Sequence, residues 1–558
     1  MEIKLTEAED ELCTLLDECT RRIKEKKGLE TTCRIAGGWV RDKLLGHQSH
    51  DIDIALQDMM GMTFAEHFVT YCRSVKHISV KNIAKIESNP DQSKHLETAK
   101  TTVLDLELDF VNLRSEEYAE HSRIPTQVAF GTPLQDALRR DITINALFYN
   151  VHSRVVEDHT GKGLDDMRSG TIRTPLPPKE TFSDDPLRVI RCIRFASRYG
   201  FDMVPELQEA AQDPEIQASR IALASKISRE RVGEELDKMM RGRDPLHAIK
   251  LIKDLSLFSS IFHIPQNIAV TLSARPAPQD TALAAASYLY AFLNPTLPNL
   301  SSIVPLSFPP LHHLLLSGTA SEPSPISRLY LACALTPYRG VTCLDSKDKI
   351  QLAVEPAIRE GLKLGVQHHY LDGIPTLFAA VDKLGNAVVG KGHEQPAAQW
   401  DRAAIGLLLR EKVVHNPNLG STWSISLLFS LVQELVPLWD IERDEFDAEE
   451  ATKRVIAYNE LVARIEELKL PAAVDAKPIL DGRTVMRTLG TATPGPWTGD
   501  VLSRVVEWQL RHPEGSTDEC QNWLISEKAA GRINIVTNTS GSKRKDGSGG
   551  KSAKKAKR

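Results

Sequence analysis

A chain of 558 residues with a formal net charge of −5 is long enough for several domains and is not basic as a whole. A nucleic-acid partner would therefore have to bind a local basic face. No apolar run approaches the length of a membrane span, and the acidic start MEIKLTEAEDELC does not resemble a targeting peptide. The eight cysteines form no CxxC pair, which favours reduced thiols inside the cell over a zinc site.

The stretch RIAGGWVRDKLLG, residues 34 to 46, predicts a strand, a tight glycine turn and a short helix that ends at Gly46. Gly37 and Gly38 at the start of that helix let backbone N–H groups come close to a ligand, and this end of a helix attracts anions. Arg41, one turn further on, adds a planar charged group suited to phosphate oxygens. The stretch therefore predicts a phosphate-binding turn.

The segment DIDIAL alternates acidic and apolar residues as a half-buried strand does. Ile52 and Ile54 would face a core, while Asp51 and Asp53 share the other face. Two neighbouring carboxylates repel each other, and a divalent cation such as Mg²⁺, which prefers oxygen ligands, removes that cost. A solvated strand edge shows the same pattern, so the metal site depends on its context. With the glycine turn, the segment matches what phosphoryl or nucleotidyl transfer to a hydroxyl requires.

A further acidic strand is predicted in LDLELDFVNL. Leucines at alternate positions from Leu104 would line one face, and the other face would carry Asp105, Glu107 and Asp109. The pattern by itself equally describes an ordinary half-exposed strand. Beside a pair of metal-binding carboxylates, a third can orient or deprotonate an attacking hydroxyl or bind a second metal ion. We take Asp109 as this third catalytic carboxylate.

The segment DALRRDITINALFYN predicts an amphipathic helix that begins near Gln135. Asp141 and Asn145 lie four residues apart and would share one face of it. A solvated surface with ordinary ion pairs explains these charges as well. Beside a nucleotide site, Arg140 can bind a phosphate and Asp141 can accept a hydrogen bond from a ribose hydroxyl.

The segment SDDPLRVIRCIRFASR predicts another helix, capped by Ser183 or Asp184, with Pro186 in its first turn. Its charged residues recur every three positions, at Asp185, Arg188, Arg191 and Arg194. This spacing also describes a solvated helix face. Cytosine and adenine, however, each present an amino donor beside a ring-nitrogen acceptor, while guanine and uracil present the reverse. A carboxylate and a guanidinium held together could therefore bind C and A and reject G and U without a template.

Four motifs in this order, GGWVRD…DIDI, LRRDITINALFYN, DDPLRVIRCIRFASR and ISRERVGEEL, resemble those of class II tRNA nucleotidyltransferases, the CCA-adding enzymes, in their fungal form. The similarity is strong over residues 30 to 240, and LDGRTVMRTLGTATPGPWTGDVLSRVVEWQL resembles the family's C-terminal tRNA-binding part. The chain departs from many bacterial relatives in having Asp184 where they carry Glu, which is a conservative difference.

The resemblance implies an α+β fold with a polymerase-beta-like nucleotidyltransferase head at residues 1–150, followed by all-α domains. These would be a neck at 151–265, which carries the base-reading helix, and a tRNA-binding body and tail at 266–530. A stretch rich in Pro and Ser near 265–325 is expected to contain a loop or insert, and 531–558 to be a disordered basic tail.

The resemblance also implies template-independent addition of C, C and A to the 3′ end of tRNA from CTP and ATP, with release of pyrophosphate. It assigns two Mg²⁺ ions to Asp51 and Asp53. It assigns contacts with the nucleotide to Gly37, Gly38, Arg41, Arg140, Asp141, Asn145, Asp185, Arg188, Arg191 and Arg194. The segment ISRERVGEEL is expected to be structural, because its Arg/Glu spacing suits ion pairs between helices.

Several alternatives stay open. Relatives that add only CC, only the terminal A, or poly(A) share nearly every motif, although the full-length segment NLRSEEYAEHSRIPTQVAFG favours complete CCA addition. A non-catalytic tRNA-binding protein is disfavoured by the intact Asp51 and Asp53. The segment GNAVVGKG, residues 385 to 392, nearly matches the P-loop of an ATPase, but Gly392 replaces the Ser or Thr that binds Mg²⁺, so we interpret it as a surface loop.

We expect tRNA, CTP and ATP as partners, with no membrane and no obligate protein partner. The expected location is the cytoplasm and the nucleus, and a mitochondrial form would require an alternative start. The basic sequence SGSKRKDGSGGKSAKKAKR at the end of the chain suits a nuclear import signal or a non-specific RNA contact. The pairs His312–His313 and His368–His369 are expected to cap helices or to pack.

Overall fold

The computed structural model describes residues 2–86, 98–118, 125–216, 228–295, 309–320, 325–391 and 395–533. Two compact units are present, one made of residues 1–381 and 417–454 and the other of residues 382–416 and 455–558. The predicted disordered tail lies outside the described residues. All eight cysteines are buried and none forms a disulfide. Within the described ranges, no helix has the length and apolarity that a bilayer crossing needs.

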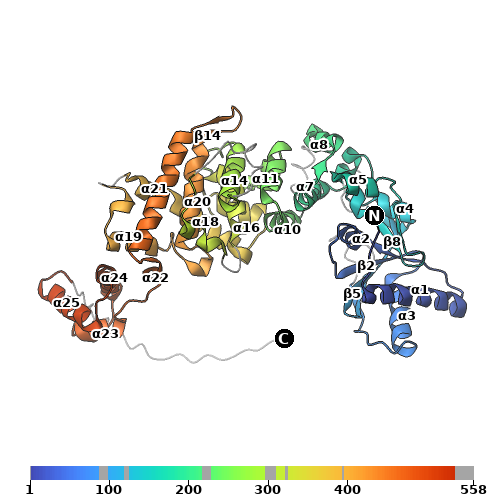
Figure 1. The fold of residues 1–558 in the computed structure, drawn as a ribbon, viewed down its shortest axis with the longest axis horizontal. Helices are drawn as coiled ribbons and strands as arrows, with labels where there is room; N and C mark the ends of the chain where they lie inside the picture. Colours follow the sequence, from blue (N-terminus) through green and yellow to red (C-terminus); the bar gives the residue numbers. More distant parts are fainter. Residues whose placement is uncertain are drawn as a thin grey trace, which may run out of the picture. The chain divides into compact units, whose positions relative to one another are not determined.

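A mixed sheet with strand order β3-β4-β5-β2-β1-β8-β9 forms the centre of the head. β2 and β5 run parallel, and the other neighbours are antiparallel. Its strands are β1 (Cys33–Ala36), β2 (Asp51–Leu56), β3 (Ala84–Ile86), β4 (Thr98–Val103), β5 (Leu106–Asn112), β8 (Phe148–Asn150) and β9 (Val155–Glu157). α1 (Glu7–Lys27) and α3 (Gly61–Ser74), both labelled in the head in Figure 1, pack on the sheet. α1 contacts β1, and α3 contacts β4 and β5, where its Phe64 and Phe68 pack on Phe110. The apolar face of the sheet is thereby covered.

The alternation predicted for the two acidic strands is confirmed in β2 and only partly in β5. Ile52 and Ile54 are fully buried, and Asp51 is exposed on the other face. β5 begins at Leu106, because Leu104 and Asp105 form the turn of the β4–β5 hairpin with φ angles of 52° and 61°. A two-residue hairpin turn of this kind needs positive φ at both positions, so neither residue can continue the strand.

The long helix predicted from Gln135 is wrong. α4 covers only Pro133–Leu138, and a 3₁₀ turn follows at Thr143–Asn145 before β8 begins. Ile142 between them is extended, with φ −140° and ψ 151°. The β-branched run Ile-Thr-Ile disfavours a continuous helix. The preceding segment NLRSEEYAEHSRIPTQVAFG forms the hairpin of β6 (Arg114–Tyr118) and β7 (Pro125–Phe130), and residues 119–124 lie outside the described ranges.

Helices follow the head, as predicted. The neck region contains the pair β10 (Thr171–Ile172) and β11 (Asp202–Met203) and the helices α5 (Gly163–Ser169), α6 (Pro178–Asp184), α7 (Leu187–Tyr199), α8 (Pro205–Gln212), α10 (Arg229–Met240) and α11 (Pro245–Asp254). The predicted capping of α7 was wrong, because Ser183 and Asp184 end the preceding helix. Instead, Asp185 accepts the N–H of Leu187 at 3.0 Å through Oδ1. Asp185 is thus fixed at the break between two helices.

The body contains more helix than the sequence indicated. Its elements are α12 (Phe258–Ile261), α13 (Gln266–Ala269), α14 (Asp280–Leu293), α15 (His313–Ser317), α16 (Ile326–Ala334), α17 (Val354–Pro356), α18 (Tyr370–Val389) and α20 (Trp423–Leu435), with the hairpins β12–β13 (Thr342–Leu344, Ile350–Leu352) and β14–β15 (Trp439–Asp440, Glu445–Phe446). α14 lies within the stretch expected to contain a loop or insert, of which residues 296–308 and 321–324 lie outside the described ranges. The helix is mostly buried, because its Ala-rich sequence lets α11, α16 and α20 pack closely. Residues 385–389 end α18 and form no surface loop, because Ala387 and Val388 are buried.

The second compact unit has a core of its own. It contains α19 (Arg402–Arg410), α22 (Pro471–Val474), α23 (Gly482–Thr488), α24 (Pro496–Arg511), α25 (Thr517–Ala529) and most of α21 (Ala448–Glu467). Trp497, Val505 and Trp508 of α24 pack with Leu524 of α25. The C-terminal sequence that resembled the tRNA-binding part of the family thus forms a packed helical domain.

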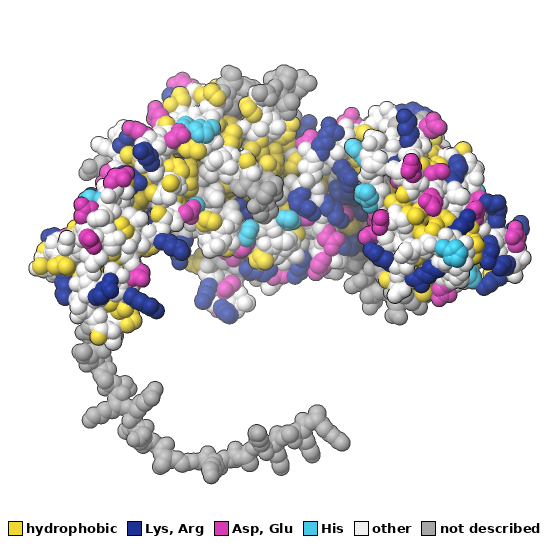
Figure 2. All heavy atoms as spheres, turned by 60° about the horizontal axis from the view of Figure 1, so that its bottom comes forward, with side chains coloured by type: hydrophobic (Ala, Val, Ile, Leu, Met, Phe, Trp, Pro, Cys, Tyr) yellow, Lys and Arg dark blue, Asp and Glu magenta, His cyan; other side chains and the backbone are white. Residues whose placement is uncertain are grey.

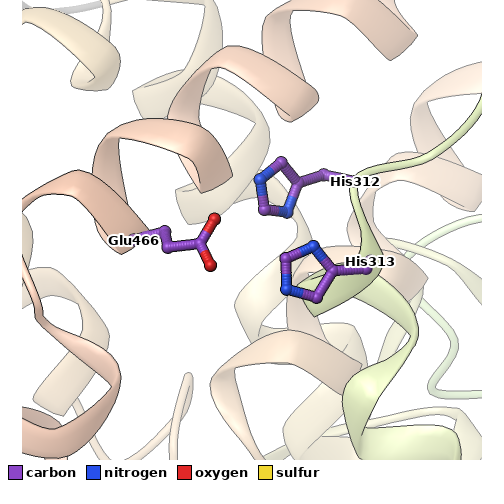
Figure 3. A group of neighbouring side chains, drawn as sticks. All are labelled: His312, His313 and Glu466. Atoms are coloured by element: carbon purple, nitrogen blue, oxygen red, sulfur yellow. The ribbon is translucent and has the colours of Figure 1, made fainter.

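The paired histidines of the body include one helix cap. His312 accepts the N–H of Leu314 at the start of α15, which confirms the expected capping role. Figure 3 shows its ring stacked on that of His313, with 4.7 Å between the ring centroids. The third labelled residue, Glu466, belongs to the second compact unit.

Candidate active site

A cavity of about 550 Å³ in the first unit brings together most of the predicted site residues. They come from the turn before α2 (Gly38–Leu44), from β2, from the segment after α4 and from α7. The predicted residues that line it are Gly37, Gly38, Arg41, Asp53, Arg140, Asp141, Asn145, Asp185, Arg188 and Arg191. Asp51, Asp109 and Arg194 are not among the lining residues. The other lining residues, which were not predicted from the sequence, are Thr98, Val111, Asn112, Arg114, Arg139, Phe195 and Arg231.

The acidic edge of the cavity is built by the parallel strands β2 and β5. Their register places Asp51 opposite Glu107 and Asp53 opposite Asp109. Burial raises the pKa of Asp53 to about 6; Arg140 opposes the shift, and the charges of Asp51 and Asp109 add to it. A carboxylate whose ionisation is resisted by burial and by like charges is one that a divalent cation would stabilise. The oxygen donors and their charge therefore fit Mg²⁺.

Lys100 is a member of this edge that the sequence analysis missed. It lies opposite Asp109 on β4, and its Nζ is 2.7 Å from Asp109 Oδ2. The hydrogen bond that Lys100 donates to Asp109 raises the pKa of Lys100 and keeps it protonated. Lys100 thus holds the third carboxylate in place. The signal was available in the sequence, because recognising the turn at Leu104–Asp105 brings positions 100 and 109 together.

The glycine turn makes room for the side chain of Arg140. Gly37 has φ 65°, and a Cβ at this position would lie 2.5 Å from Arg140 Nη1. Arg140 donates to Asp136 Oδ2 through Nε and Nη2, at 3.1 and 2.9 Å, and to the Asn145 carbonyl through Nη1 at 3.0 Å. A guanidinium has five N–H groups, so two remain for a ligand. Only glycine leaves room for this arrangement.

Arg41 is buried and fixed by both head and neck. It donates to Asp42 Oδ1 at 2.8 Å and to the side-chain oxygen of Asn145. Its guanidinium also lies 5.2 Å from the ring centroids of Phe195 and Tyr199 on α7. A cation held between two aromatic rings and a carboxylate has a defined orientation at the cavity wall.

Asp141 positions other side chains. Its Oδ1 accepts from the Ile142 N–H and from Asn145 Nδ2, each at 2.9 Å, and its Oδ2 binds Arg191 Nε and Nη2 at 2.8 and 2.6 Å. Burial would raise the pKa of Asp141, but Arg191 and these hydrogen bonds lower it to about 2. Both oxygens are fully used, so the expected ribose hydrogen bond has no acceptor site here. Asp141 instead orients Arg191 and Asn145.

The predicted base-reading pair lies together at the cavity wall. Asp185 Oδ2 is 3.6 Å from Arg231 Nη2 on α10, and Arg188 donates through Nη2 to the Arg139 carbonyl at 2.8 Å. Arg188 is buried, and Asp185 is also held by the Leu187 N–H. Both groups therefore have fixed orientations, which selective hydrogen bonding to a base edge requires.

Two residues of the segment ISRERVGEEL, Arg229 and Glu235, make the structural contacts that were expected of it, whereas Arg231 of the same segment lines the cavity. Glu235 of α10 accepts from Arg191 at 3.3 Å and also pairs with Arg194 of α7. Arg229 donates to the carbonyls of Gly361, Ser260 and Ile261. Arg194 thereby supports α7 and is not among the residues that line the cavity.

Two family models match the chain. The poly A polymerase head domain matches residues 33–173, and the probable RNA- and SrmB-binding site of polymerase A matches residues 201–267. The chain is 37% identical to the mitochondrial CCA tRNA nucleotidyltransferase of Saccharomyces cerevisiae, over 93% of this chain and 92% of that protein. It is 34% identical to a tRNA nucleotidyltransferase of Schizosaccharomyces pombe, over 95% of this chain and 98% of that protein. The chain belongs to the CCA tRNA nucleotidyltransferase family.

The fold of the chain agrees with that assignment. The CCA-adding enzyme of Bacillus stearothermophilus, solved in complex with CTP, has a TM-score of 0.56 and 17% identity, and the match covers 95% of this chain and all (100%) of that one. The α+β class and the polymerase-beta-like head followed by helices are thus confirmed. The resemblance noted in the sequence motifs is confirmed with them.

Proposed function

We propose that the chain adds C, C and A to the 3′ end of tRNA from CTP and ATP by in-line nucleotidyl transfer, with release of pyrophosphate. The observation that carries the proposal is the single cavity that collects the acidic residue Asp53, the glycine turn with Arg41 and Arg140, and the pair Asp185–Arg188. These groups are respectively suited to a metal, a triphosphate and a base edge. The names of the fungal relatives support the same reaction.

Different residues of the chain act on the triphosphate and on the attacking hydroxyl. The 3′-hydroxyl oxygen of the RNA bonds to the α-phosphorus of the nucleotide, the bond to the β-phosphate oxygen breaks, and pyrophosphate leaves. The free N–H groups of Arg41 and Arg140 hold the triphosphate in line, and alignment itself lowers the barrier. The hydroxyl proton passes to a carboxylate of the β2–β5 edge, for which Asp109 is our candidate.

Asp51 and Asp53 would hold Mg²⁺, and we propose two ions. When bound there, the metal supplies a Lewis acid that lowers the pKa of the hydroxyl and stabilises the leaving group. The ordered support around the site, Lys100 on Asp109 and Arg140 near Asp53, comes from the chain itself.

The proposal is tested with tRNA transcripts that end before the first C, after C, or after CC, incubated with each of the four nucleotides. We expect CTP alone to extend the first transcript by two residues, and ATP to be used only after CC. Addition that stops at CC, begins only at A, or continues as a poly(A) run would assign the chain to a narrower relative. Binding without any addition would leave a non-catalytic tRNA-binding protein.

The pH dependence of the rate of nucleotide addition should follow the ionisation of Asp53. The raised pKa means that Asp53 is protonated below about pH 6 in the absence of metal, and a protonated carboxylate is a poor ligand. At subsaturating Mg²⁺ we expect single-nucleotide addition to fall as the pH drops through this value. Raising Mg²⁺ should move the fall to lower pH, because metal and proton compete. Rates from pH 5 to 8 at two Mg²⁺ concentrations check this, and a midpoint that ignores Mg²⁺ would contradict it.

We propose that the basic tail directs the protein to the nucleus and takes no part in nucleotide addition. Its residues lie outside those that the structure describes. Deleting residues 541–558 should leave addition in vitro almost unchanged at moderate salt and reduce nuclear accumulation of a fluorescent fusion. A large loss of activity would show that the tail binds tRNA. For comparison, two of the fungal relatives carry the word mitochondrial in their names.

A further inference from the structure

A second, larger cavity lies on the neck beside the candidate active site. It has a volume of about 780 Å³ and is formed by the C-terminal halves of α7 and α10, with Leu45 and His47 from the head. We call it the basic basin, after its five cationic side chains, Arg194, Arg198, Lys238, Arg241 and Arg243. In Figure 2, Lys and Arg side chains gather over this neck region, next to the head. In a chain with a net charge of −5, this is the kind of local basic face that a polyanion needs.

The charges of the basin are only partly neutralised. Glu235 pairs with Arg194 and lies 3.7 Å from Lys238, and Asp237 binds Arg241 at 2.7 Å. Arg198 and Arg243 are exposed, and among the described residues no carboxylate forms an ion pair with either. Arg198 is placed over the ring of Tyr199, 5.3 Å from its centroid. The basin therefore keeps at least two cationic groups for an external anion.

The basin and the first cavity share a wall. Phe195 lines the first cavity and Tyr199 the basin, and their rings stack with 6.2 Å between centroids. Arg41 lies over both rings, and Tyr199 donates to Asp42 at 3.0 Å. Arg191 at the first cavity and Arg198 at the basin are two helical turns apart on α7, or roughly 10 Å. If the end of a polymer lies in the first cavity, monomers only a few positions from that end can contact the basin.

We infer that the basic basin binds the phosphodiester backbone of the substrate RNA a few nucleotides from its 3′ end. The inference rests on the proposed function, which places that 3′ end in the first cavity. Exposed, unpaired arginines with long flexible stems suit a phosphate chain, which binds mainly through charge. The basin offers neither a carboxylate pair for a metal nor a fixed Asp/Arg pair for a base, so it does not suit a second nucleoside triphosphate.

The test removes the two unpaired charges in the full-length chain. We compare Arg198→Ala/Arg243→Ala with Arg198→Lys/Arg243→Lys and with the control Lys347→Ala/Lys349→Ala, which removes two exposed cations from the β12–β13 hairpin. Affinity for tRNA lacking CCA is measured by fluorescence anisotropy without nucleotide, at several KCl concentrations. The rate constant kcat and the KM values for tRNA and CTP are measured separately, with thermal unfolding as the check on folding.

We expect the alanine pair to weaken tRNA binding roughly ten-fold near physiological salt and to make the salt dependence shallower by about one to two in log–log slope, since each lost phosphate contact removes roughly 0.7–0.9. The KM for tRNA should rise with it, while kcat and the KM for CTP stay unchanged. The lysine pair should keep most of the affinity, and the hairpin control should behave as wild type.

Wild-type affinity and slope in the alanine pair would overturn the inference, as would a loss in the lysine pair equal to that in the alanine pair. A rise confined to the KM for CTP, or a change in inhibition by pyrophosphate, would assign the basin to free phosphates and overturn it too. Failure of the proposed function is distinguishable, because a wild-type chain that adds no nucleotide can still show RNA binding that depends on the basin.

Discussion

Replacing Asp53 by alanine should abolish nucleotide addition and leave tRNA binding largely intact. Asp53 is the carboxylate of the DxD pair that lines the cavity, and its raised pKa marks it as the group most in need of a cation. Loss of a metal that stabilises the transition state by several kcal/mol corresponds to a fall of roughly a thousand-fold or more in rate. The RNA should stay bound, because its phosphates are held mainly by cationic side chains elsewhere. Single-turnover addition and anisotropy measure the two quantities.

The matched control is Asp165→Ala, an exposed carboxylate of α5 that pairs with Arg168 at 2.6 Å and does not line the cavity. It should add nucleotides at the wild-type rate. Thermal unfolding of Asp53→Ala should show no loss of stability, since removing a buried carboxylate surrounded by like charges does not expose an unpaired partner. More than a few per cent of wild-type addition by Asp53→Ala would refute the metal site proposed here.

Removing either member of the pair Asp185–Arg188 should narrow the discrimination among nucleotides. Asp185→Ala loses the acceptor that favours the amino groups of C and A, and Arg188→Ala loses the donor that rejects a ring N–H. A hydrogen bond to a charged group contributes about 1.5–3 kcal/mol, so CTP and ATP should each lose roughly ten-fold to a hundred-fold in kcat/KM. The kcat/KM values for GTP and UTP should fall by a smaller factor. Incorporation of each nucleotide is measured on tRNA that ends before the first C and on tRNA that ends in CC.

Asp184→Ala serves as the control for this experiment, because Asp184 is the neighbouring acid in sequence and does not line the cavity. Asp185→Ala also removes the hydrogen bond to the Leu187 N–H, which costs about 1 kcal/mol of stability, so activities are compared well below the unfolding transition. If Asp185→Ala and Arg188→Ala both kept the wild-type kcat/KM ratios among the four nucleotides on both transcripts, the pair would be an ordinary element of the α6–α7 break. The base would then be recognised by other residues.

Local pattern was sufficient for the features that depend on a single element. The alternation in DIDIAL placed Ile52 and Ile54 in the core and Asp51 and Asp53 on the opposite face, because side chains of a strand alternate whatever packs against it. Four motifs in order were enough to indicate the family, which the full-length relatives then confirmed. Local pattern failed at the predicted helix from Gln135, where β-branched residues and pairing of β8 with β1 outweigh the apolar periodicity.

Only the tertiary structure decided which charged groups line the cavity and which pair with one another. Asp141 meets Arg191 across 50 positions, Arg194 meets Glu235 across 41, and Arg41 meets Asn145 across 104. Periodicity states which face of a helix is charged, but it does not state which other element packs on that face. For this reason both oxygens of Asp141, which was expected at the ribose, are occupied by protein groups, and Arg194, which was expected to contact the nucleotide, lines the basic basin. The sequence determined the chemistry that is available, and packing assigned each side chain its partner.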